Sequence, residues 1–376
     1  MTILFDYQAF CIQPYGGVSR YFTELITGIG KTEGIDTYLP IVLSNNRHLQ
    51  EAGIQTHSFF PGTPFKFRES IMIRVNRWHT INKMKVNNYD IFHATYYNPY
   101  FLPYLSEQGK RKPSVVTFLD MIHEKYGHQF TYLAEDKRLF TYKRELAQKA
   151  DRLIAISEST KRDMVDLLDV NPEKIDVIYL GNSFSTPPTV DTPPSSQQNP
   201  YLLFVGIRIG YKNFDGMLKA ISPILKREKI SLVCVGGGAF FVAEQTLIRS
   251  LNVADLVTQQ TATDATLATL YGNAIGFIFP SLYEGFGIPV LESFACNCPC
   301  LLSTGGSLPE IGGDAALYFD PNVPDELAAA LERLLGDTAL RTQLISRGRQ
   351  RLSLFTWEST VNQTVALYQK LRTATS

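Results

Sequence analysis

Short runs of apolar residues alternate with longer amphipathic segments along almost the whole chain. Runs of this kind, bounded by turn residues, are typical of parallel strands that helices cover on both faces. The pattern therefore predicts an α/β protein with doubly wound parallel sheets. The clearest predicted strands cover residues 3–5, 91–93, 115–118, 153–156 and 175–178, and then 201–205, 232–235, 276–279 and 300–302.

A segment rich in Pro, Ser and Thr separates the two sets of predicted strands. It covers residues 184–200, and its prolines favour extended backbone over helix. We place a domain boundary here, which predicts Rossmann-like domains over 1–183 and 201–356, with a last helix at about 357–371 packing back on the first. Ligands of such sheets bind outside the carboxyl ends of the strands, so we expect the two domains to face each other across a ligand-binding cleft.

Composition narrows the possible partners. The chain has 36 Lys and Arg against 36 Asp and Glu, which argues against nucleic acid as the main partner. Its start reads as a strand rather than a signal peptide, and no apolar run reaches the ~18 residues that span a bilayer. The five cysteines are odd in number, which favours a reducing, cytoplasmic location, and Cys296, Cys298 and Cys300 are spaced too closely for a usual zinc site.

Two glycine-containing segments follow predicted first strands. Gly16 and Gly17 precede an amphipathic helix, where free amides and the helix dipole can receive a phosphate, although a plain turn fits as well. In the second half, Val205 to Asn213 carries Arg208 and Lys212, two cations that can clamp a diphosphate. A solvated basic loop is an equally good reading of that segment taken alone.

A third motif runs from Pro280 to Glu292. A predicted strand ends, a glycine loop turns, and a helix begins near Pro289. Glu284 on the loop and Glu292 on the helix are eight positions apart. We expect carboxylates at this separation to hold the hydroxyls of two linked sugars, while loop amides contact the phosphates between them.

These residues resemble the family-4 retaining glycosyltransferases of GT-B fold. In the second half the resemblance rests on VGIRIGYKN, the Glu284 to Glu292 element, and the segments 303–310 and 312–316. In the first half it rests more loosely on Gly16-Gly17, residues 90–93, residues 116–120 and residues 155–159.

The resemblance implies a role for each matching residue. Arg208 and Lys212 would bind the donor diphosphate, with Gly16 and Gly17 close to the distal phosphate. The transferred sugar would be held by Glu284, the likewise donor-binding Gly285, and the amides of Phe286, Gly287 and Ile288. Glu292, beside Leu291, would take the ribose hydroxyls, and Gln260 and Thr261 would lie near the base. No cofactor or metal is implied, and the chain contains no Asp-x-Asp motif.

One position departs from the family pattern. The family usually has His directly before Asp120, where this chain has Leu119, and His123 follows three residues later. We expect an active enzyme, because a retaining front-face route needs no strong general base, with Asp120 and His123 lining the acceptor region. A surface position for His123 is as good a reading. His93 and Tyr96 could stack on an acceptor sugar, although core packing of these rings is the favoured interpretation.

The expected activity is metal-independent transfer of a hexose, with GDP-mannose as the preferred donor, to a sugar or lipid-linked acceptor. Two alternatives stay open: a non-hydrolysing sugar-nucleotide epimerase of the same fold, and an inactive sugar-nucleotide-binding assembly protein suggested by Leu119.

Residues 66–85 hold six basic side chains against Glu69, with Ile71, Val75 and Trp78 among them. This segment predicts peripheral contact with the inner face of a membrane, against an ordinary packed surface helix as the favoured alternative.

Overall fold

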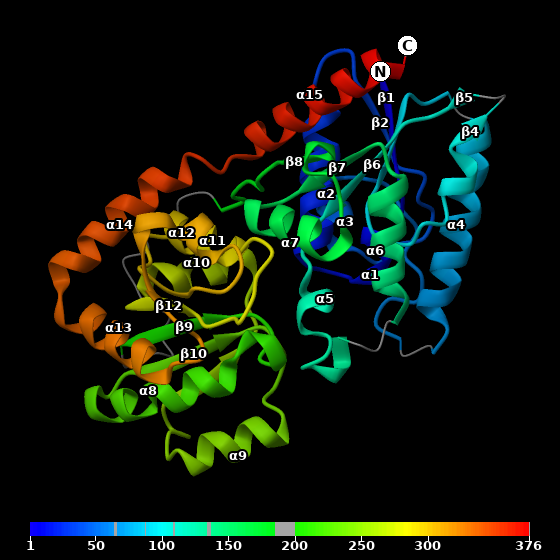
Figure 1. Cartoon of the computed structure of the whole chain (residues 1–376). Helices are drawn as coiled ribbons and strands as arrows, with labels where there is room; N and C mark the ends of the chain where they lie inside the picture. Colours follow the sequence, from blue (N-terminus) through cyan, green and yellow to red (C-terminus); the bar gives the residue numbers. More distant parts are fainter. Residues whose placement is uncertain (64–65, 87, 108–109, 134–136, 185–199, 376) are drawn as a thin grey trace. The chain divides into compact units, whose positions relative to one another are not determined.

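A computed structural model describes residues 1–63, 66–86, 88–107, 110–133, 137–184 and 200–375. The chain divides into two compact units (Figure 1). Unit 1 comprises Met1–Gly127, Thr131–Gly181 and Trp357–Ser376, and unit 2 comprises His128–Phe130 and Asn182–Thr356. The predicted boundary segment 184–200 lies almost wholly outside the described residues.

Unit 1 is built on a parallel six-stranded sheet with the order β2-β1-β3-β6-β7-β8. A separate antiparallel pair, β4 (Ser106–Glu107) and β5 (Lys110–Arg111), lies outside this sheet. The strands of the sheet are β1 (Thr2–Phe5), β2 (Asp36–Tyr38), β3 (Ile91–Ala94), β6 (Ser114–Phe118), β7 (Arg152–Ala155) and β8 (Ile175–Val177).

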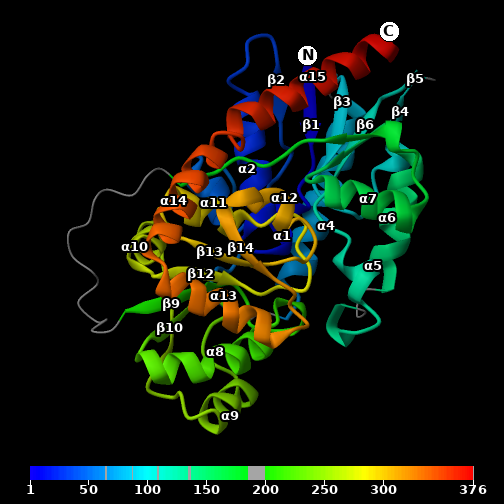
Figure 2. The same cartoon turned by 60° about the vertical axis from the view of Figure 1, so that its left-hand side comes forward.

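The helices of unit 1 include one from the far end of the sequence. Helix α15 (Trp357–Thr375) packs against α2 (Gly17–Ile29) (Figure 2). The contact is close, since a Cβ on Gly28 would come within 2.4 Å of the Val361 side chain. The other helices are α1 (Ala9–Ile12), α3 (Arg47–Glu51), α4 (Arg68–Val86), α5 (Ile122–Tyr126), α6 (Lys137–Lys149) and α7 (Glu158–Leu168).

Unit 2 has a second parallel six-stranded sheet, with the order β11-β10-β9-β12-β13-β14. Leu232 and Ile278 of the sheet belong to one core cluster with Leu218 of α8 and Leu331 of α13. The strands are β9 (Tyr201–Val205), β10 (Ser231–Val235), β11 (Val257–Gln260), β12 (Gly276–Phe279), β13 (Cys300–Ser303) and β14 (Ala316–Phe319). The helices are α8 (Phe214–Glu228), α9 (Val242–Ser250), α10 (Asp264–Asn273), α11 (Ile288–Ala295), α12 (Leu308–Gly312), α13 (Pro324–Gly336) and α14 (Thr338–Leu352).

The predicted fold class is confirmed: both units are Rossmann-like, and every strand expected from an apolar run is present within a residue or two. The sheet strands that the apolar pattern missed are β2, β11 and β14, each of which is an edge strand of its sheet. An edge strand has one neighbour and needs less apolar surface, so Asp36–Tyr38 and Val257–Gln260 carry polar residues where inner strands carry Val, Leu and Ile.

The closely spaced cysteines are buried where α11 leads into β13: Cys296 caps the end of α11, Cys298 lies between the two elements, and Cys300 begins β13. Burial raises the pKa of Cys296 and of Cys300 to about 12, so both thiols stay protonated and pack as small apolar groups. Within the described ranges, no group of three or more His, Cys, Asp or Glu could hold a metal ion. No described helix is long and apolar enough to cross a membrane.

Candidate functional site

The sheet of unit 2 has one point where the strand order reverses, between β9 and β12. From β9 the chain proceeds to β10 and β11 on one side, and from β12 to β13 and β14 on the other. The loops that leave the carboxyl ends of β9 and β12 separate here, which is where open parallel sheets bind ligands. They remain tied to each other, since the Leu282 amide donates to the Tyr211 carbonyl at 2.7 Å.

Lys212 and Glu284 meet at this point. Lys212 ends the short 3₁₀ turn Gly210–Lys212 after β9, and its Nζ lies 2.6 Å from Oε1 of Glu284 in the loop after β12. The ammonium also stands over the rings of Tyr211 and Phe279, 5.0 and 5.2 Å from their centroids. The side chains keep 14% and 13% of their exposure, so a cation and a carboxylate are held together within reach of solvent.

The loop after β13 supports Glu284 through its backbone. Ser307 donates its amide to the Glu284 carbonyl at 3.0 Å and its hydroxyl to the Phe286 carbonyl at 2.7 Å. Gly306 has φ +63°, and a Cβ there would come within 2.3 Å of the Glu284 carbonyl oxygen. Glycine is therefore required at this close approach of two backbones.

Helix α11 begins directly after this loop. Gly287 precedes the helix with φ +105°, and Pro289 lies in the first turn. One helical turn later, Glu292 is buried, and its Oε2 accepts a hydrogen bond from the Tyr271 hydroxyl on α10 at 3.2 Å. Burial and the nearby Glu292 carboxylate raise the pKa of Tyr271, so its hydroxyl keeps the proton that it donates. Sequence reasoning did not identify Tyr271, because only the packing of α10 on α11 brings it to Glu292.

Of the remaining predicted donor residues, some are buried and others are partly or fully exposed. Gly285, Phe286 and Leu291 are buried, and Phe286 packs edge-on against Phe355. The Leu291 side chain is 0% exposed and packs in the core of unit 2. Ile288 is half-buried, whereas Gln260 and Thr261 stand at the carboxyl end of β11, two strands away from β9.

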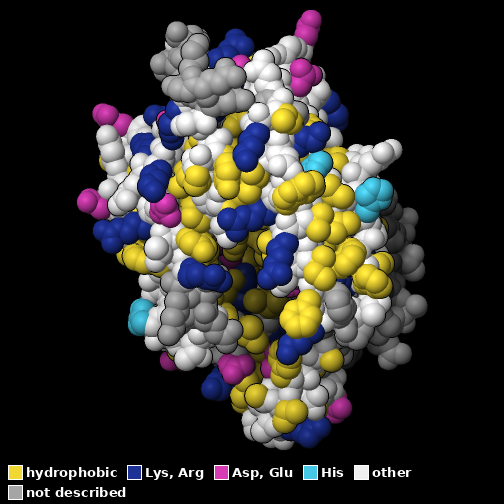
Figure 3. Space-filling view, turned by 90° about the vertical axis from the view of Figure 1, so that its right-hand side faces the viewer, with side chains coloured by type: hydrophobic (Ala, Val, Ile, Leu, Met, Phe, Trp, Pro, Cys, Tyr) yellow, Lys and Arg dark blue, Asp and Glu magenta, His cyan; other side chains and the backbone are white. Residues whose placement is uncertain are grey.

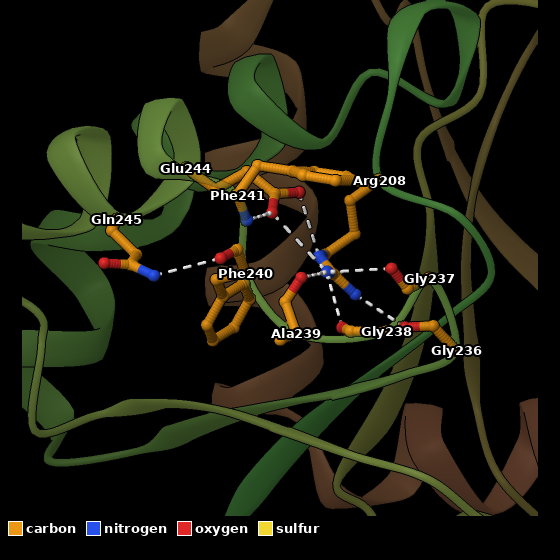
Figure 4. A network of polar contacts seen from close by, with 9 residues as sticks. All are labelled: Arg208, Gly236, Gly237, Gly238, Ala239, Phe240, Phe241, Glu244 and Gln245. Atoms are coloured by element: carbon orange, nitrogen blue, oxygen red, sulfur yellow. Dashed lines mark hydrogen bonds and ion pairs between the residues drawn. The ribbon is translucent and has the colours of Figure 1, made fainter.

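Arg208 has a different environment from the one we predicted. Its guanidinium is buried between the loop after β10 and the start of α9 (Figure 4). Nε lies 2.9 Å from Oε1 of Glu244, and the terminal nitrogens donate to the carbonyls of Gly236 at 2.6 Å, Gly238 at 2.8 Å and Ala239 at 3.2 Å.

The same network explains the glycine run that follows β10. Gly236, Gly237 and Gly238 all have positive φ, and a Cβ on Gly237 would come within 2.9 Å of the Arg208 guanidinium. Glu244 closes the network, since its Oε2 accepts from the Phe241 amide at 2.6 Å. Three consecutive glycines with positive φ allow the loop after β10 to direct its backbone carbonyls at the Arg208 guanidinium. In this structure the Arg208 guanidinium therefore supports the loop after β10, and its contact with a donor diphosphate stays a prediction.

The glycine pair in unit 1 stands at the start of α2. Gly17 is the first residue of the helix, and the Gly16 carbonyl accepts from the Arg20 amide at 3.0 Å. Gly17 is exposed and Gly16 half-buried, so the N-terminal end of a 13-residue helix is open to solvent. This placement is compatible with the predicted phosphate contact.

Asp120 and His123 lie between β6 and α6. Asp120 follows the carboxyl end of β6, and its side chain is 34% exposed. Its Oδ1 accepts from the Ile122 amide at 3.1 Å, which orients the carboxylate at the start of α5. His123 is half-buried on α5.

His93 is a core residue, not an acceptor-binding one. It is fully buried, with Nδ1 2.5 Å from the Tyr368 hydroxyl on α15 and Nε2 2.9 Å from Oγ1 of Thr117. Burial lowers its pKa to about 3, so the ring is neutral. The structure thus supports core packing over acceptor stacking for His93, while Tyr96 stays half-buried beside Tyr97, ring centroids 4.6 Å apart.

Unit 1 also has a reversal of strand order, between β1 and β3, and a buried carboxylate occupies it. Asp6 accepts from the Thr95 amide at 2.9 Å and from Nε2 of Gln8 at 2.6 Å. Burial raises the pKa of Asp6, although these donors oppose the effect. An Asp directly after the first strand is the signal that could have identified this position from the sequence.

Two family comparisons cover most of the chain. Residues 15–182 match the family Glycosyltransferase Family 4, and residues 190–351 match Glycosyl transferases group 1. The first match contains Gly16, Gly17 and Asp120, and the second contains Lys212, Glu284 and Glu292.

Individual relatives and structures agree with these matches. The chain is 34% identical over 46% of its length to O-antigen chain mannosyltransferase B of Escherichia coli, covering 46% of that protein. It is 30% identical over 60% of its length to MMP alpha-(1->4)-mannosyltransferase of Mycolicibacterium hassiacum, covering 56% of it. The matched regions thus span about half the length of these relatives. Sucrose-phosphate synthase from Thermosynechococcus elongatus shares the fold, with a TM-score of 0.80 over 99% of both chains at 21% identity.

Proposed function

Since this chain belongs to the family 4-type glycosyltransferases of GT-B fold, we propose that it transfers a hexose from a nucleotide-diphosphate sugar to a saccharide or lipid-linked saccharide. The observation that carries this proposal is the Lys212–Glu284 pair where the strand order of unit 2 reverses. The named relatives are mannosyltransferases, so GDP-mannose is the preferred donor and a growing O-antigen-like glycan the preferred class of acceptor.

Lys212 supplies the positive charge for the leaving diphosphate. Its ammonium carries three donors, one of which Glu284 takes at 2.6 Å, and two are left for phosphate oxygens. A cation held in place before the reaction stabilises the charge that develops as the sugar–phosphate bond breaks. In this proposal no metal ion is required, because Lys212 and the N-terminal end of α11 neutralise the diphosphate.

Glu284 and Glu292 hold hydroxyl groups of the donor. Glu284 has a second carboxylate oxygen that can accept from the transferred sugar, while Glu292, oriented by Tyr271, accepts from the ribose. The proposed reaction retains the anomeric configuration: the leaving diphosphate departs from the face on which the acceptor oxygen attacks, and the acceptor proton passes to the diphosphate oxygen. Asp120 and His123 are then acceptor-side groups, and Gly16 and Gly17 contact the distal phosphate.

The decisive experiment measures nucleotide binding and transfer separately. We expect GDP to raise the melting temperature more than UDP or ADP, and GDP-mannose to support transfer to a mannose-terminated acceptor in the presence of EDTA. Glu284→Gln should lower kcat by about 10²- to 10³-fold, whereas Glu332→Gln, on the exposed side of α13, should leave it unchanged.

Other outcomes identify the rival functions. Conversion of the sugar nucleotide into its epimer, without transfer, would make the chain an epimerase. Tight nucleotide binding without turnover of any donor would make it an inactive binding protein. Full activity of Glu284→Gln would contradict the site assignment. Proton NMR of the newly formed linkage tests retention, because an inverted anomeric configuration would exclude the front-face route.

A second part of the proposal concerns α4 and an anionic membrane. The side of this helix that faces the protein carries Met72, Asn76, Thr80 and Met84, and Asn76 bonds the backbone of residues 42 and 43. The outer side carries Trp78 and Val86, 67% and 74% exposed, among basic side chains. Figure 3, a view of the face where α4 lies, shows apolar and basic groups intermixed there. Exposed Trp next to Arg and Lys favours an anionic lipid surface.

Vesicle sedimentation tests this contact. The chain should pellet with phosphatidylglycerol-containing vesicles and stay in solution with phosphatidylcholine alone. Trp78→Ser with Arg74→Glu should abolish pelleting, and Phe241→Ser, an exposed aromatic in unit 2, should not. Equal pelleting of both variants would contradict a role for α4.

A further inference from the structure

Unit 1 contains a lysine with no exposed side-chain surface. Lys143 lies on α6, and its Nζ is 2.9 Å from both the Asp120 carbonyl and Oε2 of Glu124, and 3.7 Å from Oδ1 of Asp120. The ammonium also stands 4.8 Å from the centroid of the Tyr97 ring. A buried lysine is rare, and none of the motifs that identify the family includes it.

Tyr97 extends this cluster to the residue before Asp120. Its hydroxyl accepts from the Leu119 amide at 2.8 Å. Burial, with Asp120 nearby, raises the pKa of Tyr97, so the hydroxyl stays protonated. Lys143 therefore holds the carbonyl of Asp120 and Tyr97 holds the amide of Leu119, which secures the turn after β6 from both sides.

Stability alone does not account for the cluster. The Glu124 side chain is 1% exposed, and its Oε1 has no hydrogen-bond partner among the residues that the structure describes. A buried ion pair with an unsatisfied oxygen is no more stable than a well-packed apolar pair of the same volume, and is often less stable. The arrangement instead fixes geometry. The Asp120 side chain stays one-third exposed, while the backbone of the turn is held at the Leu119 amide and the Asp120 carbonyl.

On the premise of the sugar transfer proposed above, we propose that Lys143, with Glu124 and Tyr97, is a positioning residue that holds the Leu119–Asp120 turn for the reaction. Leu119 stands where the family usually has His. A Leu side chain offers no polar group to anchor this turn, so its orientation depends on the backbone contacts of Tyr97 and Lys143. Displacement of a reacting group by about 1 Å costs about 10²-fold in rate, which makes such anchoring effective.

The test uses the double variant Lys143→Met/Glu124→Gln, which removes both buried charges at nearly constant volume. The matched control is Lys149→Met/Glu145→Gln, an exposed ion pair on the same helix. The first readout is hydrogen exchange, which requires no activity. We expect faster exchange confined to residues 119–126 in the test variant and none in the control. Unchanged exchange there would overturn the proposal.

The second readout is kinetic. The test variant should lose about 10- to 100-fold in kcat with a donor KM within twofold of the wild type, because none of the proposed donor-binding residues lies in the Leu119–Asp120 turn. Adding Asp120→Asn to the test variant should lower kcat little further. If Lys143 acts through Asp120, the effects of the two changes on kcat are not additive in free energy. Fully multiplicative effects, or wild-type kcat, would contradict positioning. If the wild type transfers no sugar while exchange still responds, the proposed function fails and the anchoring of the turn stands.

Discussion

Each of the two units has its own parallel six-stranded sheet, but the polar residues where the strand order reverses differ between the two sheets. In unit 2, Lys212 and Glu284 pair with each other and keep part of their surface exposed. In unit 1, Asp6 is fully buried and accepts hydrogen bonds from Gln8 and Thr95. Both arrangements place a carboxylate at the carboxyl edge of a sheet, yet only the first leaves donors and acceptors that a ligand can use.

The difference shows that position in the fold does not make a residue functional. A polar group at the carboxyl edge is available for chemistry only if the protein has not already saturated its hydrogen-bonding capacity. Arg208 illustrates this within unit 2, because every nitrogen of its guanidinium is bonded to protein acceptors. In unit 1, the partly exposed acid is Asp120, one strand away from the reversal.

We expect the largest effect from a substitution of Arg208. Arg208→Ala leaves Glu244 as a buried, unpaired carboxylate, and it should destabilise unit 2 by about 3–5 kcal/mol. Both tryptophans, Trp78 and Trp357, belong to unit 1, so calorimetry rather than tryptophan fluorescence should measure this loss.

Arg227→Ala is the control for that variant, because it breaks exposed ion pairs with Glu228 and Glu332. Its stability should match that of the wild type, because solvent screens exposed ion pairs. An Arg208→Ala protein with wild-type stability and a large loss of nucleotide affinity would return Arg208 to the diphosphate site.

Lys212 gives the next largest effect. Lys212→Ala should lower kcat/KM by about 10²- to 10³-fold, equivalent to about 3–4 kcal/mol, because the leaving diphosphate loses its cation. Steady-state kinetics with the preferred donor measures it, and Lys219→Ala on the exposed side of α8 should match the wild type. Retention of full activity would remove the functional distinction between the two sheet edges.

His93 should make the stability of unit 1 depend on pH. Burial lowers its pKa to about 3 in the folded state, against about 6.5 when unfolded. The neutral ring therefore stabilises unit 1 fully above pH 6.5, and this stability declines as the pH falls from 6.5 toward 3. Between pH 7.5 and 5.5 the loss should be about 1.4 kcal/mol.

Urea unfolding followed by tryptophan fluorescence measures this loss, since both tryptophans report on unit 1. His93→Gln should abolish the part of the pH dependence that belongs to His93. If the variant shows the same pH dependence as the wild type, groups other than His93 make the stability of unit 1 depend on pH.

The smallest expected effect concerns Tyr271. Tyr271→Phe removes the hydrogen bond to Glu292 and should weaken nucleotide binding about fivefold, equivalent to about 1 kcal/mol. Isothermal titration with the preferred nucleotide measures the change. Tyr318→Phe, whose hydroxyl donates to the Gly313 carbonyl, is the matched control. Equal nucleotide affinities of the wild type, Tyr271→Phe and Tyr318→Phe would show that the Tyr271 hydroxyl does not contribute to donor binding.

Much of the fold was predictable from the sequence because inner strands of a doubly wound sheet must be apolar on both faces. The runs at 115–118 and 276–279 therefore predict β6 and β12 directly. The polar strand Val257–Gln260 was not predictable, because it is an edge strand whose sequence carries no apolar run.

The candidate site shows the same division. From the sequence it follows that Lys212 and Glu284 lie in loops between a strand and a helix and that Glu292 lies on a helix, because glycine loops and helix starts have local signatures. Only the tertiary structure decided which polar groups remain available. Tyr271 meets Glu292, Lys143 meets Asp120, and Arg208 meets four successive carbonyls through contacts between elements distant in the chain. Hydrogen-bond partners are set by packing in three dimensions, so neither their presence nor their number can be read from local spacing.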